Sequence, residues 1–497
     1  MINFKPTSAL VLSLVCSASR SAAQLPGTFT ATGSMTTPRV NHTATLLTNG
    51  KVLMAGGGQA ADPVQPFPVS WRVLASAELY DPSSGTFTRT GDMTSPRIGH
   101  TATLLPDGRV LMAGGLDPSA NALISAELYD PASGTFAPAG NMIQARGYHA
   151  ATLLAGGRVL LAGGQRNPPF IAEVYDPSIA TFLSVGPLPF YPSQLTLLAD
   201  GKVLIQGMDA ADFVRGFCLP AGCRFQSALY DPNRGFRLDE PIREYWTIVT
   251  ATLLTTGKVL DTMLVTDEEN ETDVAELYDP STWVFAPRKM AAIRRSATAT
   301  LLPDATVLIA GGGDSDLQWS NRETSGAEVY DPVADKFPRT GSMAENREGH
   351  TATLLPDGTV LIAGGGINLF GTATAEIYHP NVLIPAAVLF SLSRDGRGQG
   401  AVWHAMTGQV ASANNPAIAG EALSMYTTSL VDGGVIPPQV AIGGRLAEVL
   451  YFGAAPGYPG YSQVNFRVPS GITPGPSVSV RLNYLNRPSN EVTMAVN

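Results

Sequence analysis

Charged residues are scarce in this chain of 497 residues. Only 15% are Asp, Glu, Lys or Arg, and the net charge of −9 leaves no basic excess for the phosphates of a nucleic acid. After the first residues, no apolar run is long and continuous enough to span a bilayer. The composition therefore argues against a nucleic-acid partner and against a transmembrane segment in the mature protein.

Cysteine is rarer still, with three copies, and the first lies in a segment typical of a secretory signal. Lys5 precedes an apolar stretch over 9–15, and the small residues 21–23 suit cleavage after Ala23. Cys16 raises the alternative of a lipoprotein, although the preceding residue is Val15 rather than a small one. We expect an exported protein that is secreted, periplasmic or held at the cell surface.

The two remaining cysteines, Cys218 and Cys223, form an even pair in an exported chain, which predicts a disulfide. Half of a zinc site is the alternative, but no second Cys or His pair follows. Also missing are a Gly-x-Ser-x-Gly elbow, a His-Glu-x-x-His motif and a phosphate-cradling loop. The sequence therefore predicts no catalytic residue, no resident metal and no cofactor.

Glycine and proline, in contrast, are abundant, with 51 and 38 copies, and predict many turns and few helices. The phrase over 101–115 holds two short apolar runs around Asp107-Gly108, which predicts a hairpin with a tight primed turn. A third run over 125–129, a second turn and a fourth run starting at Thr135 complete an antiparallel meander of four strands.

This unit recurs along the chain, and the tyrosine of its third run marks each copy. The copies fall 46 to 55 residues apart, at Tyr80, Tyr129, Tyr175, Tyr230, Tyr278, Tyr330 and Tyr378. Seven units of about 50 residues with a Gly-Gly and a later Tyr resemble the kelch repeat, which implies a β-propeller. Phenylalanine replaces the kelch tryptophan near the fourth strand.

The two ends of the array complement each other. Residues 26–35 match the fourth strand over 84–93, whereas the seventh unit has no such strand after Pro380. We therefore predict that the N-terminal segment pairs with 375–378 as the outer strand of blade seven, which closes the ring and removes a sheet edge.

Beyond Pro380 the repeat stops, and short apolar runs between Pro/Gly turns predict an immunoglobulin-like β-sandwich without its disulfide. The phrases over 398–404, 443–449 and 463–469 resemble a C-terminal domain of unknown function that closes many secreted bacterial proteins. The predicted fold is all-β: a signal peptide (1–23), a seven-bladed kelch-type β-propeller closed by an N-terminal outer strand (24–382) and the sandwich (383–497).

The long insertions all emerge at one end of the blades, over 58–76, 208–227, 266–274 and 313–326, so a ligand site is expected there. Aromatic and charged side chains in these insertions suit a sugar or a peptide; solvated loop residues are the alternative. The candidates carried forward are Trp71, Arg72, Trp319 and Arg322. The acidic run over 267–273 lacks EF-hand spacing, so a solvated loop is favoured over a calcium site.

The same end receives an Arg-x-x-His at the start of four inner strands: Arg39 with His42, Arg97 with His100, Arg146 with His149, and Arg347 with His350. As a functional group, these residues form an arc near the channel mouth that could bind a ligand such as a metal or an anion. As a structural group, they make a repeated hydrogen bond between blades, which is the favoured interpretation.

A kelch propeller followed by a β-sandwich also resembles galactose oxidase and related copper radical oxidases. The resemblance implies a cysteine cross-linked to a tyrosine, a second tyrosine next to a histidine, and a further histidine. The one adjacent pair is Tyr378-His379, and this tyrosine is the one that marks the repeat. The copper site is not supported by these residues.

We therefore expect an exported non-catalytic binding protein with a glycan or protein partner on the loop-rich face of the propeller. The alternative is a carbohydrate-active enzyme of kelch type, either an oxidase similar to galactose oxidase or a sugar epimerase or mutarotase. A structural surface component is a third possibility. The sequence does not indicate an oligomeric state.

Overall fold

The computed structural model describes residues 27–60, 71–165, 167–215, 224–238, 243–244, 246–265, 272–290, 294, 296–315, 321–323, 325–367, 370–431 and 433–497. The predicted signal peptide, the Cys218–Cys223 disulfide and Trp319 lie outside the described residues. One short helix, α1 (Ala210–Arg215), accompanies strands throughout the described part, so the chain is all-β as predicted.

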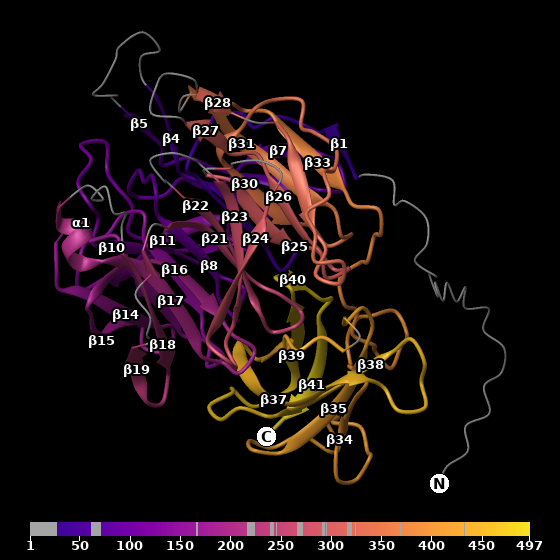
Figure 1. Ribbon diagram of the computed structural model, residues 1–497. Helices are drawn as coiled ribbons and strands as arrows, with labels where there is room; N and C mark the ends of the chain where they lie inside the picture. The colour runs from indigo at the N-terminus through magenta and orange to yellow at the C-terminus, as the bar shows by residue number, and fades with distance from the viewer. Residues whose placement is uncertain are drawn as a thin grey trace.

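Seven sheets follow one another along the chain as antiparallel meanders, and their first strands contact each other in a closed ring (Figure 1). Blades one to three consist of β2 (Thr43–Leu46), β3 (Val52–Ala55), β6 (Ala77–Asp81) and β7 (Thr86–Arg89); β8 (Thr101–Leu104), β9 (Val110–Ala113), β10 (Ser125–Asp130) and β11 (Thr135–Asn141); and β12 (Ala150–Leu153), β13 (Val159–Ala162), β14 (Phe170–Asp176) and β15 (Thr181–Leu188).

Blades four and five consist of β16 (Phe190–Leu197), β17 (Val203–Asp209), β18 (Arg224–Asp231) and β19 (Gly235–Leu238), with β20 (Arg243–Glu244) beside β18; and β21 (Trp246–Leu253), β22 (Val259–Val265), β23 (Thr272–Asp279) and β24 (Val284–Lys289). Blades six and seven consist of β25 (Thr298–Leu301), β26 (Val307–Ala310) and β29 (Ala327–Tyr330); and β30 (Glu348–Leu354), β31 (Val360–Ile367) and β33 (Ala375–His379), with β32 (Phe370–Gly371) beside β31.

The predicted fourth strand of blade six is reduced to two isolated bridges, from Glu328 to Arg339 and from Asp331 to Lys336. Pro338 lies between them and has no N–H to donate, which explains the broken ladder. Phe337 still packs against Tyr330, with ring centroids 4.8 Å apart.

The turn between the first two strands is the same in all seven blades. In blade two, the Leu105 N–H donates to the Arg109 carbonyl at 2.8 Å, and Gly108 has φ +92°. Asp107 is not left-handed; its carboxylate accepts from the Arg109 N–H at 3.0 Å. The turn is therefore a three-residue loop ending in a left-handed residue, which is glycine in six blades and Ala305 in blade six. The predicted primed turn with two left-handed residues is wrong.

The second strand of each blade is buried on both faces because its sheet lies between two others. Leu111 and Met112 are 1% and 0% exposed. On the third strand, Tyr129 packs on Phe136 at 4.8 Å, and its hydroxyl bonds Thr90 of the preceding blade at 3.0 Å. Tyr129 therefore joins blades one and two.

The ring is closed by β1 (Thr28–Ala31), which pairs antiparallel with β33. Thr28 lies opposite His379, Phe29 opposite Tyr378, and the pairing continues to Ala31 and Glu376. Figure 1 shows the two strands side by side although they come from opposite ends of the propeller sequence. The predicted N-terminal outer strand is thus confirmed.

The C-terminal part forms one curled sheet around its own apolar core. Its strands are β34 (Val402–His404), β35 (Ala422–Thr427), β36 (Gln439–Ile442), β37 (Arg445–Ala454), β38 (Ser462–Arg467), β39 (Gly475–Tyr484), β40 (Arg487–Pro488) and β41 (Val492–Val496). β37 bonds to β38 in one half and to β36 in the other, which agrees with a β-sandwich. No helix in the described residues is long and apolar enough to cross a membrane.

This sandwich docks on the face of the propeller that carries the tight turns. The Val435 N–H donates to Thr255 in the turn of blade five at 3.0 Å. The buried Arg487 donates to the Ile384 carbonyl at 2.6 Å and reaches Pro356 in the turn of blade seven at 3.5 Å. The sandwich therefore covers the tight-turn face, and the loop-rich face points away from it (Figure 1).

Candidate functional site

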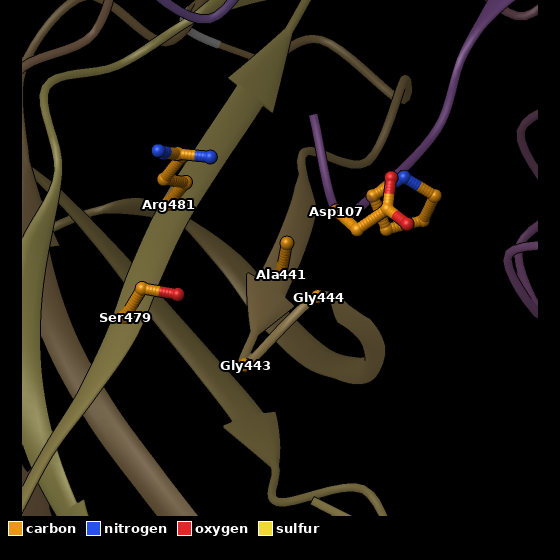
Figure 2. Close-up of a pocket in the computed structure, with 7 residues that line it drawn as sticks. Asp107, Ala441, Gly443, Gly444, Ser479 and Arg481 are labelled. Atoms are coloured by element: carbon orange, nitrogen blue, oxygen red, sulfur yellow. The ribbon is translucent and has the colours of Figure 1, made fainter. Parts of the chain in front are cut away.

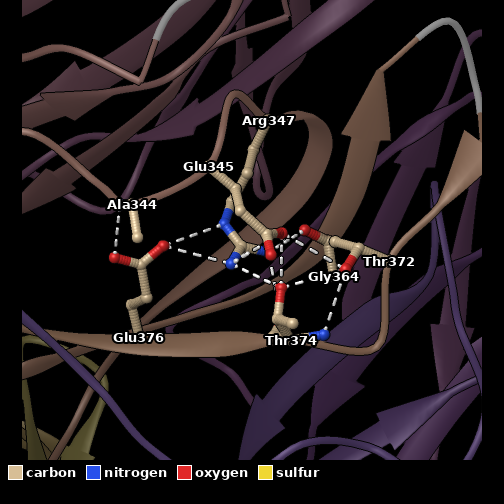
Figure 3. A network of polar contacts seen from close by, with 7 residues as sticks. All are labelled: Ala344, Glu345, Arg347, Gly364, Thr372, Thr374 and Glu376. Atoms are coloured by element: carbon tan, nitrogen blue, oxygen red, sulfur yellow. Dashed lines mark hydrogen bonds and ion pairs between the residues drawn. The ribbon is translucent and has the colours of Figure 1, made fainter.

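The four predicted arginines lie fully buried where the chain enters a blade. Figure 3 shows Arg347, which donates to the Gly364 and Thr374 carbonyls at 2.8 and 3.0 Å and pairs with Glu376 at 3.1 Å. Glu376 in turn accepts the Ala344 N–H at 2.8 Å. The pair therefore fastens the segment arriving from the preceding blade onto the third strand of its own blade.

The same arrangement recurs, with Arg39 on Glu78 at 2.9 Å, Arg97 on Glu127 at 2.8 Å and Arg146 on Glu173. Burial lowers the pKa of Arg39 and of Arg146, while their glutamate partners oppose that shift. Both guanidiniums stay charged at neutral pH, since an arginine starts from a pKa above 12. Each cation already has an ion-pair partner inside the fold.

The four histidines bridge neighbouring blades. Each Nε2 lies 2.9–3.1 Å from the Oγ1 of a threonine in the preceding inner strand: His42 and Thr351, His100 and Thr43, His149 and Thr101, His350 and Thr298. Burial, and secondarily the adjacent arginine, lowers the pKa of His100 to about 3 and that of His350 to about 4. These rings are neutral at pH 7 and only 5–6% exposed.

The Gly-Gly of each unit makes room for these rings. A Cβ on Gly114 would lie 2.9 Å from His149 Cε1, and one on Gly164 would lie 2.8 Å from His149 Cβ. The absence of a side chain at these glycines therefore leaves room for the histidine that connects two blades. Burial and hydrogen bonding favour the structural interpretation of the Arg-x-x-His pairs, and no group of three metal-ligating side chains occurs in the described residues.

The residue before each histidine has a left-handed backbone conformation and lies on the loop-rich side of the propeller. These residues are Asn41, Gly99, Tyr148 and Gly349, with φ of 49, 63, 55 and 61°. Their backbones form a chain of hydrogen bonds around the mouth: Asn41 N–H to Gly349 O at 2.9 Å, Gly99 to Asn41 at 3.3 Å, and Tyr148 to Gly99 at 2.7 Å.

Tyr148 is the unusual residue in this chain of hydrogen bonds, because bulky residues rarely adopt a positive φ. Its ring lies over Gly99, where a Cβ would come within 2.8 Å of it. Asn41 hydrogen-bonds to its hydroxyl, and burial raises the pKa of that hydroxyl, which stays neutral. The side chain is 50% exposed. The sequence prediction missed this residue; the available signal was a tyrosine where units two and seven have glycine.

The loop candidates are described in part. Trp71 and Arg72 lie on β5 (Trp71–Val73), which pairs with β4 (Gly58–Ala60), and Arg72 is exposed. Arg322 lies on β28 (Asn321–Glu323), which pairs with β27 (Gly313–Ser315). The two hairpins belong to the loop-rich face, in blades one and six.

The helix α1 of blade four packs the ring of Phe213 against other aromatic side chains of the propeller. Phe213 stacks on Tyr191 at 3.8 Å, and both rings meet the edge of Phe170. Asp212 and Asp209 both pair with Arg224. Helix α1 is therefore held in place by contacts within blades three and four.

A pocket of about 260 Å³ opens at the junction of the propeller and the sandwich (Figure 2). Asp107 lines it from the turn of blade two, and Gly444, Ser479 and Arg481 line it from the sandwich. Asp107 pairs with Arg109, and Arg481 pairs with Glu491. The charges at this pocket are thus already neutralised by neighbours in their own domains.

The adjacent residues Tyr378 and His379 end β33, the third strand of blade seven, and do not belong to the hydrogen-bonded residues at the channel mouth. Tyr378 is 2% exposed, packs on Phe29 at 4.9 Å and bonds Thr340 through its hydroxyl at 3.0 Å. His379 bonds Thr30 of β1 at 2.8 Å. Both residues hold the outer edge of blade seven together.

No protein-family model and no curated protein matches this sequence. Among solved structures, the chain is similar to a fungal alcohol oxidase of the AA5 family, solved in complex with copper. The identity is 17%, the TM-score is 0.56, and the match covers 95% of this chain and 99% of that chain. At this identity the likeness shows the fold alone, a β-propeller followed by a C-terminal β-sandwich.

Proposed function

We propose that this protein is an exported, non-catalytic binding protein that holds a glycan or a protein ligand on the loop-rich face of the propeller. The observation that carries the proposal is Tyr148, a half-exposed aromatic residue in a left-handed conformation at the channel mouth. Such strain costs about 1–3 kcal/mol and collects at functional sites. The sandwich covers the opposite face, so this mouth stays accessible.

The chemistry of the mouth suits binding. The buried Arg and His side chains are held by contacts between and within blades, so a ligand meets the ring of Tyr148, the amide of Asn41 and the exposed Arg72 on a neighbouring loop. An aromatic face beside an amide and a cation can stack on a sugar ring or a peptide group and fix its orientation.

The test uses arrays of polysaccharides and peptides to find a ligand, followed by the variant Tyr148→Ala. We expect this variant to weaken binding about tenfold, equivalent to about 1.4 kcal/mol. The loss of stability should be modest, because alanine keeps the same left-handed backbone strain and only the packing of a half-exposed ring is removed. Ile179→Ala, exposed on the tight-turn side of the same blade, is the control. Unchanged binding in Tyr148→Ala would contradict the proposal.

The likeness to the AA5 alcohol oxidase favours a second candidate, a carbohydrate-active enzyme, either an oxidase or a sugar epimerase or mutarotase. The described residues do not fit a copper site, because Tyr378 and His379 are engaged with Thr340 and Thr30 at the outer edge of blade seven. Stoichiometric copper in the purified protein, with peroxide formed from alcohols or sugars, would establish the oxidase. Product isomers without peroxide would establish the epimerase or mutarotase.

A further inference from the structure

The second feature that points to a ligand is the outer face of the sandwich, on β34, β35, β38 and β37. Along these strands, side chains alternate between the core and the solvent. Leu423, Met425, Val464 and Phe466 point inward and are 0–1% exposed. The outward side chains are Trp403, Ser424, Tyr426, Gln463, Asn465 and Tyr451.

Three aromatic rings follow one another on this face. Trp403 meets Tyr426 at a centroid distance of 5.4 Å and an angle of 65°, and Tyr426 meets Tyr458 at 5.4 Å and 54°. Tyr458 is 56% exposed and Tyr451 is 43% exposed. The rings thus form a continuous, twisted row in which Trp403 and Tyr426 are half-buried and Tyr458 is exposed.

Small and amide side chains border the row. Gln463 lies opposite Tyr426, and Asn465 lies between Ser424 and Tyr451 on the neighbouring strands. The Gln463 amide donates to the Asn465 carbonyl oxygen at 2.8 Å, which orients both groups and leaves further donors and acceptors available. We call the set Trp403, Tyr426, Tyr458, Gln463 and Asn465 the aromatic platform.

The platform carries no charge. The charged residues next to it, Glu448 and Arg467, pair with each other at 2.9 Å, and Arg467 also donates to the Gly420 carbonyl. An anionic ligand would find no free cation here, and the whole chain is negative by 9 charges. The amide pair in the middle also disfavours a dry protein interface, whose core is usually apolar. A neutral ligand with hydroxyl groups and an apolar ring face complements this surface.

We propose that the aromatic platform binds a neutral polysaccharide, whose sugar rings pack on Trp403, Tyr426 and Tyr458 and whose hydroxyls bond Gln463 and Asn465. Aromatic rings beside fixed amides supply both the apolar contact and the orientation that a sugar needs. The site lies on strands β34, β35 and β38 of the sandwich (Figure 1), so it belongs to a different domain from the mouth around Tyr148.

The test measures retention of the full chain on regenerated cellulose, xylan and chitin, with polygalacturonate and phosphatidylcholine vesicles for comparison. We expect retention on at least one neutral polysaccharide, with little dependence on salt because no charges take part. The double change Trp403→Ala and Tyr458→Ala lowers the affinity at least about tenfold. Met406→Ala, 91% exposed in the same domain but outside the platform, leaves it unchanged.

Two further variants separate binding from folding. Gln463→Leu removes hydrogen bonds while keeping the strand, and we expect it to weaken retention about threefold or more. Trp403→Phe keeps an aromatic ring, so we expect it to retain binding but to lose the ligand-induced change in tryptophan fluorescence, because Trp403 is the one tryptophan of the sandwich.

Several outcomes would overturn the inference. They are no retention on any neutral polysaccharide, retention that the platform variants do not reduce, and binding of vesicles, polygalacturonate or a second copy of the chain that depends on the same residues. Loss of retention in Tyr148→Ala, with the platform variants unaffected, would place the polysaccharide at the mouth. Conversely, failure of Tyr148→Ala to affect the array ligand leaves the platform result intact.

Discussion

At the scale of the residue, the repeat uses glycine where a side chain would be strained or would collide. Six of the seven tight turns have a left-handed glycine at one position, including Gly201 with φ +81°. Blade six has Ala305 there, with φ +72°. In the left-handed conformation, an alanine raises the free energy of the folded state by about 1–2 kcal/mol relative to glycine.

We therefore predict that Ala305→Gly stabilises the protein by about 0.5–1 kcal/mol, since the added entropy of the unfolded chain offsets part of the relief. The reverse change, Gly201→Ala, should destabilise by about 1 kcal/mol, because no atom lies closer than 3.9 Å to the new Cβ and only the backbone angle matters. Urea unfolding measures both. Equal effects of the same sign would contradict the argument.

At the scale of the element, the buried Arg–Glu pair is present in five of the seven blades. Blade five keeps the glutamate, Glu276, but has Trp246 at the arginine position. In blade two, Arg97 and Glu127 are 0% and 1% exposed and bond to each other at two points. In blade four the corresponding positions hold Phe190 and Ala228, both fully buried. The replacement in blade four agrees with the small cost of exchanging a whole buried ion pair for apolar groups.

A double-mutant cycle in blade two tests this view. We predict that Glu127→Ala costs about 3–5 kcal/mol, because Arg97 is left buried without a counter-charge. Adding Arg97→Phe, which copies blade four, should recover a substantial part of that loss. Denaturant unfolding of the two single variants and the double variant gives the coupling energy. Additive losses would show that the pair does not act as a unit.

At the scale of the whole molecule, the ring is closed by strands from the two ends of the propeller sequence, and β1 covers the edge that β33 would otherwise expose. The pairing of β1 with β33 also carries the contacts of Phe29 with Tyr378 and of Thr30 with His379. Without β1, the strand β33 would present unpaired backbone groups and exposed apolar surface.

We predict that a variant starting at residue 32 unfolds at a temperature several degrees lower and associates as its concentration rises. A variant starting at residue 27, which keeps β1, is the control and should behave like the protein that starts at residue 24. Differential scanning calorimetry and sedimentation measure the two effects. An unchanged unfolding temperature and a concentration-independent mass would show that the closure contributes nothing.

The sequence by itself determined the number of blades, their order, the partner of the N-terminal strand and the side on which loops emerge. These features rest on local patterns, namely apolar runs, turn glycines and a repeated tyrosine, which each unit carries within about 50 residues. It also suggested that the Arg-x-x-His pairs are structural, and the contacts of Arg347 and His350 favour that interpretation.

Only the tertiary structure decided which face the sandwich covers, that Tyr148 stands strained and half-exposed beside Asn41, and that Trp403, Tyr426 and Tyr458 form one row. These arrangements join residues far apart in the sequence, through contacts between blades, between the two domains, or between strands and a loop of the sandwich. Their formation depends on packing energies summed over the whole fold, and no short stretch of sequence contains that information.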